Sequence, residues 1–67
     1  MANFTQPELQ QLRENLSSEM LVISKLANFA AQIDDPQLKQ MCLNMQRTHE
    51  RHRDMLLRHL GAGQPVM

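Results

Sequence analysis

The chain has 67 residues and balances seven Lys and Arg against seven Asp and Glu, so its formal net charge is zero. A chain of this length forms one small domain and buries only about 60% of the surface that its unfolded form exposes. Its single cysteine, Cys42, excludes a disulfide within the chain and is typical of a protein in a reducing cytosol. We therefore expect a second copy of the chain or a metal ion to add stability.

Membrane insertion and secretion are not predicted. The longest apolar run, residues 20–23, is far shorter than the roughly 18 residues of a membrane span. The first residues, MANFTQPE, lack the basic region and the apolar core of a signal peptide. These features predict a cytoplasmic protein.

A first helix is predicted over about residues 5–33. Thr5 and Glu8 have the spacing of a capping box, and Pro7 falls in the first turn, where its missing N–H costs little. Further along, one seam at steps of three and four is apolar except at Glu19. Its apolar members are Leu9, Leu12, Leu16, Ile23, Leu26, Ala30 and Ile33. This spacing is typical of helices that pack at a shallow crossing angle.

The motif Asp34-Asp35-Pro36 ends this helix, because the residue before a proline is disfavoured in the α region. Asp35 is placed to cap a second helix whose first residue is Pro36. We predict this helix over about residues 36–60, with Gly61 as its C-terminal cap and a disordered tail over residues 61–67. So short a turn allows only an antiparallel neighbour.

The seam of the second helix changes from apolar residues to histidine. It comprises Leu38, Cys42, Met45, His49, His52, Leu56 and His59. In an antiparallel hairpin, Glu19 lies level with His49 and His52. Burying such groups is costly unless they satisfy one another or a metal ion, so we expect these three residues to form a polar layer.

The predicted fold of residues 1–67 is therefore a single all-α antiparallel helical hairpin. Its apolar stripes are too broad for one helix to cover the other, as in a helix that belongs to a bundle. We predict a homodimer in which two hairpins form a four-helix bundle.

The polar layer has two interpretations. In the first, Glu19 hydrogen-bonds His49 or His52 and fixes the register of the helices. In the second, Glu19, His49 and His52 are metal ligands, because neutral imidazoles and a carboxylate suit iron, zinc or manganese.

A third interpretation, RNA or DNA binding, concerns the basic residues of the second helix, which are Arg47, Arg51, Arg53 and Arg58. It is disfavoured because Glu50 and Asp54 dilute the positive charge and no aromatic residue is available for base stacking. Both glycines lie near the C-terminus, so there is no glycine-rich phosphate loop. Cys42 lies on the apolar stripe, which predicts a structural thiol. We do not expect an enzyme.

The pattern LRENLSSEMLVISKLANFAAQIDDPQLKQMCLNMQRTHERHRDMLLRHLG resembles one helical hairpin of the Coat F family of bacterial spore coat proteins. The resemblance rests on Pro36-Gln37-Leu38 in the turn, His49 midway along the next helix, and Leu60-Gly61 at its end. It implies a ferritin-like bundle completed by a homodimer, a structural or assembly role in the spore coat, and other coat or assembly proteins as partners.

The wider ferritin-like pattern implies a glutamate on the first helix, matched by Glu19, and a Glu-x-x-His motif on the second. Here that motif reads Gln46 and His49, and a neutral glutamine departs from the di-iron ligand set. We expect a non-enzymatic structural or assembly protein; a metal-binding protein and a nucleic-acid-binding dimer are the alternatives.

Overall fold

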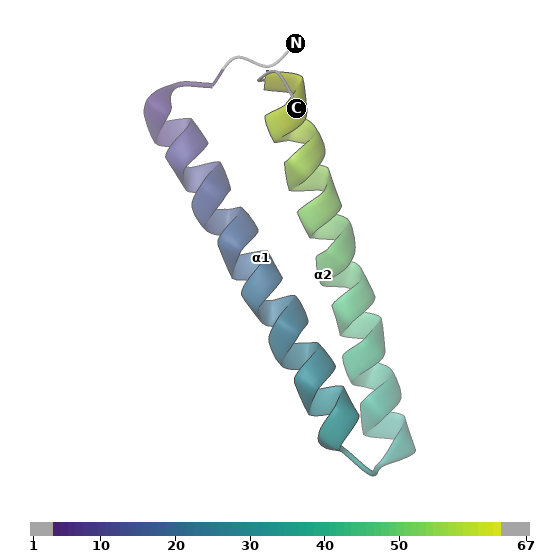
Figure 1. The fold of residues 1–67 in the computed structure, drawn as a ribbon. Helices are drawn as coiled ribbons and strands as arrows, with labels where there is room; N and C mark the ends of the chain where they lie inside the picture. Colours follow the sequence, from purple (N-terminus) through teal and green to yellow (C-terminus); the bar gives the residue numbers. More distant parts are fainter. Residues whose placement is uncertain (1–3, 64–67) are drawn as a thin grey trace.

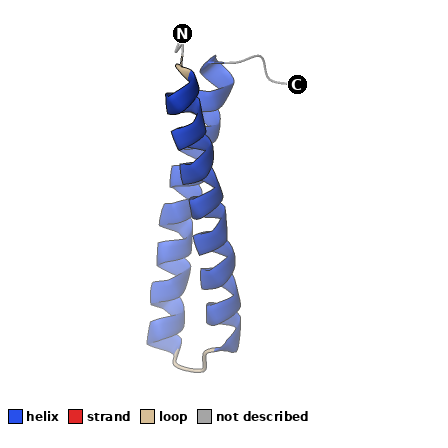
Figure 2. Cartoon of the chain, turned by 90° about the vertical axis from the view of Figure 1, so that its left-hand side faces the viewer, coloured by secondary structure: helices blue, strands red, loops and turns tan. Residues whose placement is uncertain are grey.

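The computed structural model describes residues 4–63, with side chains described as far as residue 61. It consists of two helices, α1 (Gln6–Gln32) and α2 (Pro36–Gly63). They run antiparallel and side by side, joined by a short turn at one end of the molecule (Figure 1). Seen from the side, the helices cross at a shallow angle (Figure 2). The predicted all-α helical hairpin is confirmed.

The start of α1 is the capping box that the sequence predicts. The backbone N–H of Thr5 donates to Glu8 Oε1 at 2.9 Å, and the backbone N–H of Glu8 donates to Thr5 Oγ1 at 3.2 Å. Each side chain thus satisfies a backbone donor that has no partner within the helix. The hydrogen bonds from Thr5 lower the pKa of Glu8, with the backbone N–H as the main cause.

The turn follows the predicted chemistry as well. Ile33 is extended, with φ −92° and ψ 138°, and ends α1. The carboxylate of Asp35 accepts hydrogen bonds from the backbone N–H groups of Gln37 and Leu38 at 2.9 and 3.2 Å. Asp35 therefore caps α2, and Pro36 is its first residue.

The C-terminal end of α2 differs from the expectation. The helix continues to Gly63 instead of ending at Leu60, and no glycine in the described part of the chain has a positive φ. Gly61 therefore does not act as a left-handed cap. A glycine permits that conformation without requiring it, and it can also continue a helix at a cost of about 1 kcal/mol relative to alanine. The rest of the predicted tail, residues 64–67, lies outside the described residues.

The predicted seam of α1 is the one that contacts α2. Leu9 and Ala30 are buried. The other members are half-buried, namely Leu12, Leu16, Glu19, Ile23, Leu26 and Ile33. Steps of three and four keep these side chains on one side of a helix with 3.6 residues per turn.

The seam of α2 is rotated from the prediction. Cys42 is buried and His49 and Leu56 are half-buried as expected, whereas Leu38, Met45, His52 and His59 are exposed. Gln46 and Arg53, which the prediction left out, are half-buried in their place. Long polar side chains can cover a neighbouring helix with their apolar stems while the polar ends reach water, so they fit this contact.

This rotation leaves much apolar surface uncovered. Among the described side chains, the only buried apolar ones are Leu9, Ala30 and Cys42. The radius of gyration is 14.8 Å, against about 11 Å for a compact domain of this length, and the molecule measures 45 × 18 × 17 Å. The hairpin is a rod with almost no interior.

Most of the large exposed apolar side chains, namely Phe29, Leu38, Met41, Met45 and Met55, lie on one side of the rod, whereas Met20, Leu21 and Leu57 lie elsewhere. On α2 the helical spacing aligns Leu38, Met41, Met45, His52 and Met55, and on α1 it aligns Ser18, Val22 and Phe29. A groove lined by residues of both rows, including Ser18, His52 and Met55, shows that the two rows border the same side of the hairpin. We call this side the open face; Phe29, Met41, Met45 and Met55 on it are about half exposed.

Replacing Thr5 with Ala should lower the free energy of unfolding by about 1 kcal/mol, because the cap hydrogen bond to Glu8 is lost. Urea unfolding at a fixed protein concentration measures the change. As a control, Ser17→Ala on the exposed side of α1 should leave stability unchanged or raise it by up to about 0.5 kcal/mol. Equal effects of the two substitutions would contradict the capping role.

Candidate functional site

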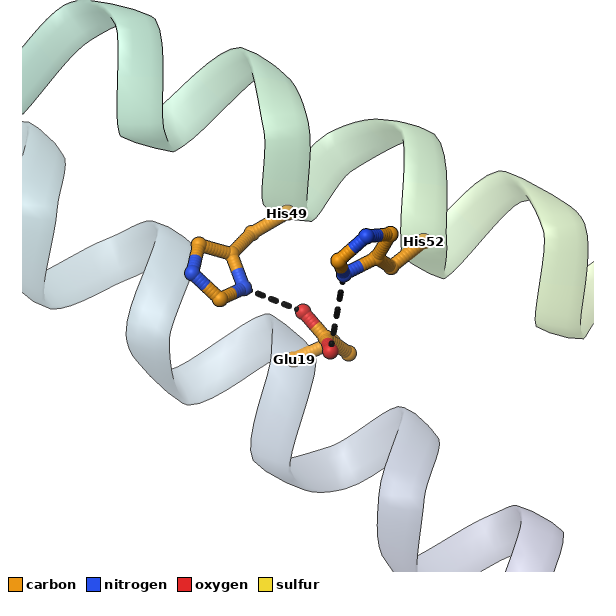
Figure 3. Close-up of side chains that lie close together, drawn as sticks. All are labelled: Glu19, His49 and His52. Atoms are coloured by element: carbon orange, nitrogen blue, oxygen red, sulfur yellow. Dashed lines mark hydrogen bonds and ion pairs between the residues drawn. The ribbon is translucent and has the colours of Figure 1, made fainter.

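The two helices place one carboxylate and two imidazoles at the same level. Glu19 is the middle residue of α1, and His49 and His52 lie one turn apart near the middle of α2. Figure 3 shows both rings of α2 turned toward the carboxylate of Glu19, which reaches up from α1. The expected meeting of Glu19 with His49 and His52 is confirmed.

The two oxygens of Glu19 serve different histidines. Oε2 lies 2.6 Å from His49 Nδ1, a short hydrogen bond in which the protonated Nδ1 donates. Oε1 lies 3.4 Å from His52 Nδ1, a looser contact. The two rings meet edge to face, with their centroids 5.6 Å apart.

Burial also separates the two histidines. The side chains of Glu19 and His49 are 21% and 28% exposed, whereas that of His52 is 49% exposed. His49 therefore belongs to the contact between the helices, and His52 lies at its edge. Beside His52 is a groove of about 340 Å³ lined by Asn15, Ser18, Glu19, His52, Met55 and Leu56.

The hydrogen bond from His49 lowers the pKa of Glu19. Partial burial penalises the charged carboxylate and so raises the pKa of Glu19. Electrostatic attraction to His49 and the weaker interaction with His52 lower the pKa further. Glu19 is therefore ionised at neutral pH. An ionised carboxylate is what both a histidine hydrogen bond and a metal ion require.

The three residues also have the composition of a metal site. One ligand atom from each of Glu19, His49 and His52 can be chosen so that all three lie within 4.8 Å of one another. Ligands of a tetrahedral ion bound at 2.0–2.2 Å lie about 3.4 Å apart, so a pair separated by 4.8 Å would have to approach by about 1.4 Å. Rotation of partly exposed side chains can supply this, and metal binding by these residues stays a prediction.

Other residues singled out in the sequence contribute nothing to this cluster. Cys42 is a buried thiol, as expected for a structural role, and His59 is exposed. Arg51 donates a hydrogen bond to Thr48 at 3.3 Å, and Arg53 pairs with the adjacent Asp54 at 3.1 Å. The arginines of α2 are thus partly engaged along their own helix.

Sequence reasoning missed the α1 side of the groove. Asn15 and Ser18 line it beside Glu19, although neither was considered as part of a site. Their positions, four residues and one residue before Glu19, could have placed them on the same flank of the helix.

The chain matches no protein-family model, no curated protein and no solved structure. The resemblance to Coat F proteins therefore stays a prediction that rests on the residues that suggested it. Within the described residues, neither helix is long and apolar enough to cross a membrane.

Replacing His49 with Ala should raise the pKa of Glu19 toward its ordinary value of 4.5, because the main cause of the lowering is removed. NMR titration of the Glu19 carboxyl carbon in metal-free protein measures the shift. In the wild type, the lowered pKa stabilises the fold above pH 4.5, and this contribution is lost as the pH falls through the folded-state value. The control variant His59→Ala should leave the titration of Glu19 unchanged, and an unchanged titration in His49→Ala would refute the assignment.

Proposed function

We propose that the chain is a non-enzymatic structural or assembly protein that works as a homodimeric four-helix bundle. One observation carries the proposal: three methionines of α2 lie about half exposed beside the contact with α1. Met41, Met45 and Met55 lie on the open face, while Gln46 and Arg53 lie between the helices. Large apolar side chains left exposed in a row beside a helix contact are typical of a surface that another partner covers.

A second copy of the hairpin fits the dimensions of this face. The rod is 45 Å long and 18 Å wide, which corresponds to roughly 800 Å² on one side. About 800 Å² per partner is the size of a standard stable interface. Two hairpins packed through the open face would bury the exposed methionines and Phe29 in a common core.

In this bundle the polar layer fixes the register. Glu19 and His49 hydrogen-bond each other within one hairpin, so the carboxylate keeps a hydrogen-bond partner when the layer is buried. The spore-coat role and the ferritin-like arrangement implied by the Coat F resemblance are the more specific form of this proposal. In that case other coat or assembly proteins would be the partners.

The dimer can be tested by sedimentation in buffer without a chelator. At micromolar concentration we expect twice the chain mass of 7.8 kDa and a melting temperature that rises with concentration. Met45→Glu should weaken dimerisation at least tenfold, because a carboxylate would be buried without a partner. Leu21→Glu is the matched control, since Leu21 is equally exposed but lies on the side of α1 away from α2. A monomer at every concentration would overturn the proposal.

Metal binding is a second candidate function, favoured by the convergence of Glu19, His49 and His52. Tag-free protein should then contain iron, zinc or manganese in a fixed ratio to the chain, and Glu19→Ala should remove the metal while His59→Ala retains it. Elemental analysis measures this. Absence of metal, with no change in the melting temperature after zinc or iron is added, would reject metal binding and leave the structural role as the one proposed function.

A further inference from the structure

The groove beside His52 separates the three polar residues into two roles. Glu19 and His52 line it, whereas His49 does not. Glu19 uses Oε2 for His49 and turns Oε1 toward His52. Glu19 and His52 therefore border an open groove, and His49 hydrogen-bonds the carboxylate oxygen that does not face His52.

The separation of this pair suits a tetrahedral metal ion. Glu19 Oε1 and His52 Nδ1 are 3.4 Å apart. Two ligands of a tetrahedral ion with bonds of 2.0–2.2 Å are also about 3.4 Å apart. The pair has the separation of two of the four ligands, so two more must come from elsewhere.

The open face provides the second pair. His52 and Met55 border the groove and belong to the apolar row that the proposed dimer covers. A two-fold axis along the bundle places residues of the same number at the same level. The Glu19–His52 pairs of both copies would then face each other across that axis.

Charge favours this arrangement over the alternatives. α1 carries three glutamates against two cations, and α2 carries five cations against two acidic residues, with the histidines neutral. An axis parallel to the helices packs α1 of one copy against α2 of the other. A perpendicular axis would place the two basic α2 helices against each other, where like charges repel.

We infer that the dimer binds one zinc-class divalent cation on its two-fold axis, through Glu19 and His52 of both copies. This inference rests on the proposed homodimer. Two carboxylates and two neutral imidazoles form a tetrahedral set suited to Zn²⁺. The two carboxylate charges balance the charge of the ion, so the metal removes a repulsion from the interface. His49 is a positioning residue that holds Glu19 through its second oxygen.

The inference predicts a stoichiometry that needs no variant. Calorimetric titration of ZnCl₂ into the full, tag-free chain after removal of metal should saturate at one zinc per two chains. Sedimentation in zinc should show a dimer at least tenfold tighter than in EDTA, because zinc binding and association are coupled.

Variants separate the ligands from the positioning residue. His52→Ala should abolish zinc binding and the zinc-dependent tightening. His49→Ala should keep one zinc per two chains but weaken it about 10- to 100-fold, as expected when a group that orients a ligand is lost. The control His59→Ala should change neither quantity. Circular dichroism of each variant checks that the helices are retained.

The outcomes distinguish this inference from the proposed function. One zinc per chain, lost in His49→Ala, would overturn the shared site in favour of a three-ligand site within each hairpin. A dimer whose affinity is the same in zinc and EDTA would overturn the inference and leave the proposed function standing. A monomer under both conditions would overturn both.

Discussion

The short hydrogen bond between Glu19 and His49 stabilises the register that the three-residue turn imposes on the hairpin. An apolar seam with steps of three and four is nearly unchanged when one helix slides by seven residues, so packing alone specifies register weakly. Glu19 interrupts the seam of α1 once, and a slide by seven residues in one direction would leave it opposite Cys42 and Met45. The cost of burying an unpaired carboxylate excludes that alternative.

The second constraint is that two helices cannot cover each other's apolar surface. The seam of α1 contacts α2. The residues of α2 in this contact are both polar and apolar, and include Gln46, His49, Arg53, Cys42 and Leu56. The contact within the hairpin is therefore mixed, and the methionines of α2 lie to one side. Such a contact tolerates polar groups because their ends reach water. The methionines of the open face would contribute to stability only if another surface buried them.

The sequence predicts the local features of this fold because their causes are local. Thr5 with Glu8, and Asp35 with Pro36, act within four residues, and the short turn sets Glu19 level with His49. The rotation of α2 was not predictable in the same way. A seam chosen by hydrophobicity excludes the polar residues Gln46 and Arg53 and includes Met45 and His52 instead. Which of these two sides of α2 contacts α1 depends on the position of α1, which the sequence pattern of α2 does not give. The predicted end of α2 was wrong for a related reason, since Gly61 permits a cap without requiring one.

The structural role and the metal role of the polar layer place the same demand on its protonation. Both need an ionised Glu19, which the hydrogen bond from His49 favours by lowering its pKa. They differ in what lies across the open face. Within one hairpin, His49 alone satisfies Glu19 Oε2, and the half-exposed His52 can be satisfied by water. Covering that face removes the water, so His52 and Oε1 must then find each other, a partner residue or an ion. In the proposed dimer, the association of two hairpins would thus make the polar layer a binding site as well as a contact that holds the helices in register.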